Sequence, residues 1–304
     1  MDTIRAVGLV VYAYGVLEER LEALWDWFGE VEAWVGQPFA EYYFTPRGKQ
    51  SLRIWKATRQ NRERLLERLR VEQPWFVLDL GWPAGTLKAR AYQTEGADVA
   101  LKSREQPWKG GADYCWPSYL SLIAHRSLLE REGSVDGLLQ LAMSAWRAID
   151  GVYGFIDIET GVPPQADLIH NFDHLLSNLI TPEYDQEFTA WQLLRSYLDR
   201  RVWKAFWGNL LGAEHLIRLG GIEELRRSDA PYRRRLPEFE QQAYREGTRI
   251  LQESSGYHRR LDLDNQGVLL TLSESPLTWY DHDEQQRRQA LDKALTKIAL
   301  RTDE

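Results

Sequence analysis

Two histidines spaced four residues apart are the pattern in this sequence that comes nearest to a metal site. His170 and His174 fall on an expected helix, where this spacing places both imidazoles on one face. Asp167 and Asp173 could add carboxylates, but the general-base glutamate of an H-E-x-x-H zinc protease is replaced by Asn171. We therefore expect two histidines on a partly exposed helix face, with no bound metal and no other cofactor.

A second pair of candidate catalytic residues stands on an expected strand. Asp157 and Glu159 alternate with two isoleucines, so both carboxylates point to the same side of the sheet. Paired carboxylates can act as general acid and base, but no histidine, lysine or glycine-rich loop stands beside them. We expect a solvated sheet face here. An enzyme of unrecognised type, centred on Asp157 and Glu159 or on His170 and His174, is the alternative.

Other catalytic signatures are missing from the sequence. Cys115 is the single cysteine and has no basic pair beside it, so we expect a small buried apolar residue rather than a nucleophile. The chain has no G-x-S-x-G elbow, phosphate-binding loop, dinucleotide fingerprint or nucleic-acid-binding module. These absences favour a binding protein over an enzyme.

Composition and charge are those of a globular protein with an acidic second half. The 304 residues are 43% hydrophobic and 27% charged, which supports a packed core and argues against disorder. The net charge is −7, with −1 from residues 1–150 (19 basic, 20 acidic) and −6 from residues 151–304 (19 basic, 25 acidic). An acidic surface disfavours nucleic acid and anionic membranes and attracts basic partners.

The N-terminal sequence predicts no export. It lacks the basic start, long apolar segment and small-residue cleavage site of a secretory signal. No stretch reaches the roughly 18 apolar residues of a membrane-spanning helix. A single cysteine also excludes an intrachain disulfide. We therefore expect a cytoplasmic protein.

Apolar periodicity predicts an α+β fold in which strands and helices alternate along the chain. Strands are expected within residues 5–14, 39–45, 75–80, 87–92, 114–125, 151–158 and 267–272. Helices are expected within residues 17–35, 58–69, 135–149, 163–180, 187–200, 210–219, 237–254 and 284–300.

The order of these elements suggests two similar lobes of antiparallel or mixed sheet with packed helices. Residues 1–94 form the first lobe, and residues 114–304 form the second, with a helical insertion around residues 163–200. Residues 95–113 are polar and contain glycine, which is typical of a loop or domain boundary.

One aromatic and glycine-rich segment resembles a known family. In residues 202–225, VWKAFWGNLLGAEHLIRLGGIEEL, the pattern W-x-N-x-L-G is followed by a helix and L-G-G. This pattern resembles the TsiV-like type VI secretion immunity family, and the resemblance covers the second half of the chain. We expect its residues to form a structural helix-and-cap unit, with positive φ at one of the last two glycines. The residues are Trp207, Asn209, Leu211, Gly212, Leu219, Gly220 and Gly221.

The resemblance implies an immunity protein that binds and neutralises a cognate effector toxin and needs neither a catalytic residue nor a cofactor. A toxin that attacks nucleic acid or a nucleotide presents a basic groove, which carboxylates around aromatic anchors would match. A scaffold or oligomer subunit is a further alternative. The candidate toxin contacts are Asp157 and Glu159 on the strand and Glu183, Tyr184, Asp185 and Glu187 in a loop.

Overall fold

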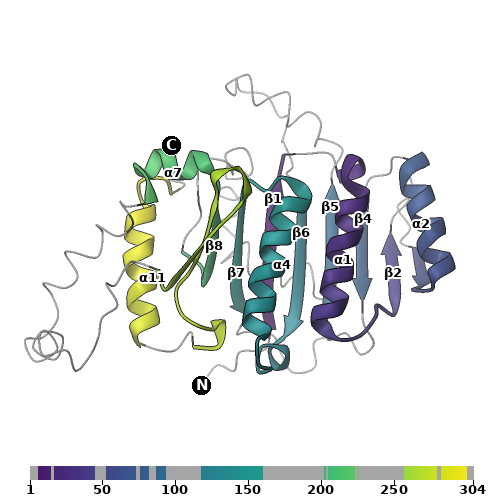
Figure 1. Ribbon diagram of the computed structural model, residues 1–304, viewed down its shortest axis with the longest axis horizontal. Coiled ribbons are helices and arrows are strands. Elements are labelled where there is room, and N and C mark those ends of the chain that lie inside the picture. The colour runs from purple at the N-terminus through teal and green to yellow at the C-terminus, as the bar shows by residue number, and fades with distance from the viewer. Residues whose placement is uncertain are drawn as a thin grey trace, which may run out of the picture.

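The structure of the chain is a computed structural model that describes residues 6–14, 17–44, 53–72, 76–81, 87–93, 118–159, 202, 205–222, 225, 257–278 and 282–299 (Figure 1). Strands and helices alternate along these residues, and the strands pair antiparallel, so the fold is α+β as the sequence predicts. No helix in this part of the chain is long and apolar enough to cross a membrane.

The described strands form one sheet of ten strands in which every neighbouring pair is antiparallel. Its order is β3-β2-β4-β5-β6-β1-β7-β8-β10-β9. The strands are β1 (Ala6–Ala13), β2 (Glu41–Phe44), β3 (Arg53–Lys56), β4 (Phe76–Gly81), β5 (Leu87–Gln93), β6 (Ser118–His125), β7 (Tyr153–Glu159), β8 (Gly208–Leu211), β9 (Arg259–Asp262) and β10 (Val268–Thr271).

The first strand of the chain lies at the centre of this sheet, between β6 and β7. All eight residues of β1 are buried, which fits its nearly continuous apolar sequence, because a strand covered on both faces has no polar side. Both neighbours of β1 come from the second predicted lobe. Strands from the two predicted lobes therefore share one sheet, while the predicted boundary at residues 95–113 lies outside the described residues.

The helices pack against this sheet, and Figure 1 shows α1 and α4 side by side in front of the central strands, with α2 at one end and α11 at the other. The α-helices are α1 (Leu21–Val35), α2 (Arg59–Glu72), α4 (Ser134–Ile149), α7 (Ala213–Leu219) and α11 (His282–Leu295). The short 3-10 helices are η1 (Leu17–Arg20), η3 (Arg126–Leu128), η4 (Asp264–Gln266) and η5 (Pro276–Thr278).

Two indole side chains join α1 to α4. Trp27 Nε1 donates to the carbonyl oxygen of Leu141 at 3.0 Å, and Trp34 Nε1 donates to the carbonyl oxygen of Ser134 at 2.9 Å. Each bond satisfies an indole N–H that the helix pair would otherwise cover without a partner. The apolar stripe that the sequence predicts on the first helix is buried at Leu17, Leu21, Leu24, Trp25, Phe28 and Val31.

Helix α7 lies on the opposite face of the sheet from α4. Tyr12 and Tyr153 are directly paired across β1 and β7, so their side chains point to the same face. Val11 points to the other face, because side chains alternate along a strand, and it lies near Trp146 of α4. The ring of His215 in α7 lies 5.7 Å from the ring of Tyr153, which places α7 on the face away from α4.

Three strands differ from the sequence-based expectation. The helix predicted over residues 210–219 begins only at Ala213, because Leu210 and Leu211 belong to β8, which pairs with β7 and β10. Strands β3 and β9 were not predicted. Both stand at the ends of the sheet and carry charged residues, and such edge strands lack the apolar alternation that marks an internal strand. The predicted insertion at residues 163–200 lies outside the described residues.

Candidate functional site

Asp157 lies in a buried ion pair and not on a solvated sheet face, so the expectation that it offers an exposed carboxylate is wrong. The side chains of Asp157 and Arg288 are 11% and 12% exposed. Arg288 of α11 donates from Nη1 to Asp157 Oδ2 at 3.2 Å and from Nη2 to Asp157 Oδ1 at 3.3 Å. The reason is tertiary, because α11 packs on the face to which Asp157 points. Glu159 ends β7, and the position of its side chain lies outside the described residues.

A second buried carboxylate, Glu284, lies one helical turn before Arg288. Glu284 is 1% exposed, and its Oε1 lies 3.6 Å from Arg288 Nη2. Its Oε2 lies 2.6 Å from Ser273 Oγ and 3.2 Å from Thr278 Oγ1. Ser273 Oγ also accepts the indole N–H of Trp207 at 2.8 Å. This buried cluster therefore joins α11 to β7, to η5 and to the residue that precedes β8.

The electrostatics of the buried cluster suit a structural role. Burial raises the pKa of Glu284 above its ordinary value, and this effect outweighs the hydrogen bond from Ser273 and the charge of Arg288. A protonated Glu284 would leave one guanidinium facing one carboxylate, Asp157, so the cluster would approach neutrality. In the described structure Ser273 Oγ donates to the Glu284 carboxylate and is hydrogen-bonded to no imidazole, which is the usual base of a serine nucleophile.

The family-like segment forms a strand, a turn and a capped helix. Asn209 is buried, and its amide group bonds to both backbone groups of Phe206, accepting from the N–H at 2.9 Å and donating to the carbonyl at 2.7 Å. Gly212 precedes α7, and its N–H donates to His215 Nδ1 at 3.1 Å. Buried Trp207 contributes the indole bond to Ser273 described above.

The end of α7 has the conformation that the sequence predicts. Gly220 and Gly221 have φ of 86° and 98°, a region that favours glycine, and the N–H of Gly221 bonds to the carbonyl of Leu216 at 2.8 Å. The buried Trp207 and Asn209 and this glycine cap hold the segment within the fold, while the expectation that it makes no contact with a toxin stays a prediction.

A hollow of about 260 Å³ opens between the N-terminal end of α4 and the β9–β10 hairpin. Among the described residues it combines charged, hydroxyl and apolar side chains in one place. Ser273 lines it, so the hollow lies directly against the buried cluster. It is lined by Arg131, Gly133, Val135, Asp136 and Leu139 on the α4 side and by His258, Arg259, Thr271, Ser273 and Glu274 on the hairpin side.

Only some of the polar groups around the hollow form hydrogen bonds or ion pairs with other described residues. Arg131 Nη1 donates to the carbonyl of Val35 at 2.9 Å, and Arg259 pairs with Asp136. The hydroxyl of Thr271 is buried and has no hydrogen-bond partner among the described residues. Burial and the nearby charge of Arg287 lower the pKa of His258, so its imidazole is neutral at pH 7 and can both donate and accept a hydrogen bond.

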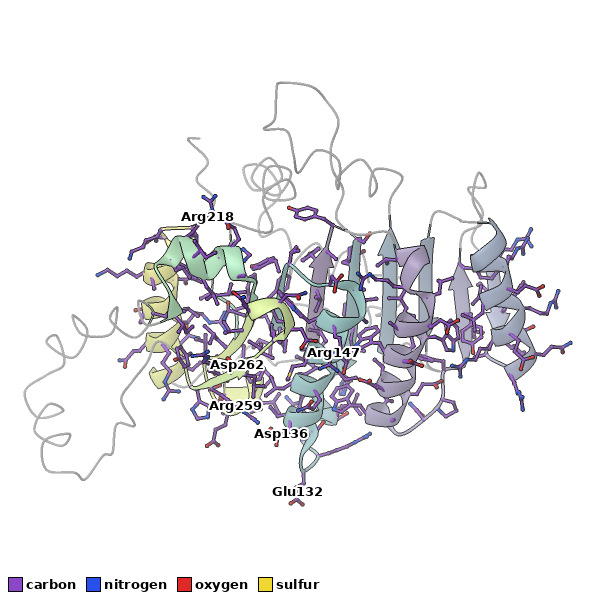
Figure 2. The ribbon with its side chains drawn as sticks, turned by 45° about the horizontal axis from the view of Figure 1, so that its top comes forward. Glu132, Asp136, Arg147, Arg218, Arg259 and Asp262 are labelled. Atoms are coloured by element: carbon purple, nitrogen blue, oxygen red, sulfur yellow. The ribbon has the colours of Figure 1, made fainter. Side chains whose placement is uncertain are left out.

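Exposed ion pairs extend this site along the whole side of α4. Arg259 joins Asp136 near the start of α4, and Arg147 joins Asp264 at 2.8 Å near its end. Figure 2 shows Asp136, Arg147, Arg259 and Asp262 along this side of the molecule. We call this surface, formed by Asp136, Arg147, Arg259, Asp262 and Asp264, the α4/β9 face. Because these side chains are 45–76% exposed, charged side chains of a partner protein could pair with them in place of the present ion pairs.

The remaining sequence-predicted residues lie outside the described residues. This applies to His170, His174, Glu183, Tyr184, Asp185, Glu187 and Cys115. In the part of the chain that the structure describes, no group of three or more His, Cys, Asp and Glu side chains could hold a metal ion.

Sequence reasoning missed the residues that the structure brings together. Asp136 and Arg259 are 123 positions apart, and Asp157 and Arg288 are 131 positions apart. One local signal was available, because Glu284 and Arg288 have the i, i+4 spacing of a helical ion pair. That spacing also occurs on solvated helix faces, so by itself it does not indicate burial.

The fold defined here is an α+β protein built on one antiparallel sheet with helices on both faces. No protein-family model and no curated protein matches the chain. A solved structure with a similar fold is the Pseudomonas aeruginosa T6SS protein PA0821, with a TM-score of 0.58 and 14% sequence identity. The similarity covers 98% of this chain and 73% of that chain. At this identity the likeness concerns the fold.

Proposed function

We propose that this protein is an immunity protein that binds and neutralises a cognate effector toxin of a type VI secretion system. The observation that carries the proposal is the fold shared with a T6SS protein over 98% of the chain. The W-x-N-x-L-G and L-G-G segment adds a short resemblance to an immunity family, although no family model matches the chain. The protein acts by occupying a surface of the toxin, in the cytoplasm, and performs no reaction of its own.

The α4/β9 face is the described surface that best fits such binding. It presents charges of both signs around a hollow of about 260 Å³, into which a toxin side chain can insert. Interfaces gain most of their affinity from a few such anchored side chains and gain specificity from the charges around them. The loop that holds Glu183, Asp185 and Glu187 is a second proposed contact.

Rescue from the toxin tests the proposal directly. We expect the neighbouring gene to encode the effector toxin. In the test, that gene is expressed in a sensitive host, once alone and once together with the gene for this protein. The proposal predicts that growth is restored only by co-expression and that the two purified proteins form a stable complex. If no product of a neighbouring gene is toxic, or if the toxic product neither binds this protein nor loses toxicity with it, the proposal is refuted.

Matched charge reversals locate the contact. Arg147→Glu changes the α4/β9 face, whereas Arg218→Glu breaks a similar exposed pair, with Glu214, on α7. Because the change makes this face more acidic, we expect Arg147→Glu to speed association with a basic toxin groove at low salt and Arg218→Glu to leave the rate unchanged. Equal association rates for both variants would remove the α4/β9 face from the interface.

Reversal of the three loop carboxylates tests the second contact separately. Changing Glu183, Asp185 and Glu187 to Lys is expected to slow association and to weaken its dependence on salt, with little change in melting temperature. A triple variant that binds as fast as the wild type at low salt would show that the loop is not part of the interface.

A further inference from the structure

The end of the sheet formed by β3 and α2 is strongly basic, although the chain as a whole is acidic. Residues 53–68 contain six cationic side chains and two carboxylates, a net charge of +4. The whole chain carries −7, so the other residues together carry −11. The basic residues are Arg53, Lys56, Arg59, Arg62, Arg64 and Arg68.

Aromatic side chains hold part of this charge in place. The guanidinium of Arg62 lies 5.0 Å from the ring centroid of Trp25, and that of Arg64 lies 5.3 Å from the ring centroid of Trp55. Both distances are within the range of a cation–π interaction, which positions the guanidinium without neutralising it. The side chain of Arg59 is 92% exposed even though it pairs with Glu63 one turn along the helix.

The same end of the molecule presents an edge strand. Strand β3 pairs with β2 on one side and is the last strand of the described sheet. Among the described residues no strand pairs with the other side of β3, so its backbone groups that point away from β2 are placed to pair with another strand, apart from the Lys56 carbonyl, which already accepts from Thr58 N–H and Asn61 Nδ2 at 2.9 Å each. Ile54 in the middle of β3 is 57% exposed and lies between the basic residues Arg53 and Lys56.

The other edge strand of the sheet has a different charge arrangement. On β9, Arg259 pairs with Asp136 and Arg260 pairs with Asp262, so each arginine has a carboxylate beside it. The six cationic side chains of β3 and α2 outnumber the nearby carboxylates, which are Glu63 and Glu67 on α2 and Glu41, opposite Lys56 on β2, whereas each arginine of β9 has a carboxylate of its own.

We propose that β3 is a docking strand for an acidic, extended segment of a protein partner, which adds to the sheet edge as an eleventh strand. The outward backbone groups of β3 would form hydrogen bonds with the added strand, and Ile54 would make an apolar contact with it. The arginines and the lysine would select a segment that carries carboxylates. A second copy of this chain is excluded from the same edge because two basic strands repel each other. This surface is separate from the α4/β9 face, and the inference does not depend on an immunity function.

A protein strand fits this surface better than nucleic acid does. Single-stranded nucleic acid binds through bases stacked on exposed aromatic rings, but Trp25 is buried and Trp55 is covered by Arg64. Glu63 and Glu67 interrupt the basic surface of α2, and the acidic remainder of the chain repels a long polyanion.

A labelled peptide tests the inference on the full-length chain. The probe is a fluorescent decapeptide of alternating Glu and Val, and its binding is followed by fluorescence anisotropy at low salt. The first control peptide has the same charge but carries proline at two of the valine positions, and proline cannot pair within a strand. The second control is a single-stranded oligonucleotide of equal charge.

The expected result separates this edge from the rest of the surface. The Arg53→Glu/Lys56→Glu variant is expected to bind the probe at least about tenfold more weakly, whereas Arg260→Glu on β9 is expected to change binding less than about twofold. Bound probe should also slow hydrogen exchange at the amides of residues 53–56. If the double variant fails to fold, Arg59→Glu on α2 provides the same comparison from a fully exposed position.

Four results would overturn the inference. Equal binding of the proline-containing peptide would mean that charge alone attracts the probe and that no strand forms. Tighter binding of the oligonucleotide would identify the surface as a nucleic-acid site. Undetectable probe binding at low salt, or binding equally weakened by Arg260→Glu, would show that β3 does not select acidic strands.

Discussion

Removal of Arg288 should be among the most damaging single changes in this protein, although the residue lies on a helix rich in charged side chains. Its guanidinium bonds to Asp157 at 3.2 and 3.3 Å and to the carbonyl of Ala205 at 3.1 Å, and it lies 3.6 Å from Glu284. Arg288→Met keeps a long apolar stem but leaves Asp157 and Glu284 buried together without a counter-charge. Removing one partner of a buried ion pair costs about 3–5 kcal/mol.

A double-mutant cycle attributes this loss to the ion pair. Asp157→Asn and Arg288→Met are each measured alone and then together by urea denaturation, with tryptophan fluorescence as the signal. The double variant is expected to lose less stability than the two single losses added together, with a coupling free energy of about 1–3 kcal/mol. Arg260→Met serves as the control, because Arg260 pairs with exposed Asp262, and we expect a change within about 0.5 kcal/mol.

Two results would refute this reasoning. If Arg288→Met changes the free energy of unfolding by less than about 1 kcal/mol, the guanidinium is not needed to balance the buried carboxylates. If the losses of the two single variants simply add, Asp157 and Arg288 do not stabilise each other in solution.

Three further changes probe other parts of the same half of the chain. Because burial raises the pKa of Glu284 above 4.5, folding favours the neutral form of this carboxyl group. The stability of the wild type relative to Glu284→Gln should therefore fall as the pH rises above about 4.5. If the melting temperatures of the two proteins keep a constant difference from pH 4.5 to 8, this prediction is wrong. Gly221→Ala should destabilise the protein by about 1 kcal/mol because φ is 98°, although there is open space around the new methyl group. The control, Gly29→Ala inside α1, should stabilise the protein by about 0.5–1 kcal/mol. If the two variants have the same melting temperature, the assignment of the glycine cap is wrong. Asn209→Ala should cost about 2–4 kcal/mol in urea denaturation, because both backbone groups of Phe206 lose a buried partner; a loss below about 0.5 kcal/mol would mean that water replaces the amide.

Local patterns in the sequence were sufficient for the elements that bury a continuous apolar stripe or strand. The first strand and the first helix were predicted within a few residues of β1 and α1, because their apolar residues repeat at the spacing of the structure that they form. A positive φ at one of the two glycines after α7 was also predicted, since glycine after a helical run adopts this conformation at the least steric cost, and the structure has it at both Gly220 and Gly221.

Edge strands and the start of α7 were not predictable for the opposite reason. Strands β3 and β9 are held by one neighbour and carry charges, so they lack the apolar alternation of an internal strand. Leu210 and Leu211 suit a helix as well as a strand, and their pairing with β7 and β10 determines that they form a strand. In this chain the sequence predicted the secondary structure of segments with a clear apolar pattern and missed the strands whose conformation depends on pairing with other strands.

The sequence by itself determined the α+β class, the α1 and α4 helices with their apolar faces, and the acidic net charge, since each depends on residue types and short spacings. Only the tertiary structure decided the position of β1 at the centre of the sheet, the burial of Asp157 under Arg288, and the meeting of Asp136 with Arg259. These contacts join positions more than a hundred residues apart. Whether a carboxylate faces water or a guanidinium depends on which helix packs over its strand, and no local pattern in the sequence contains that information.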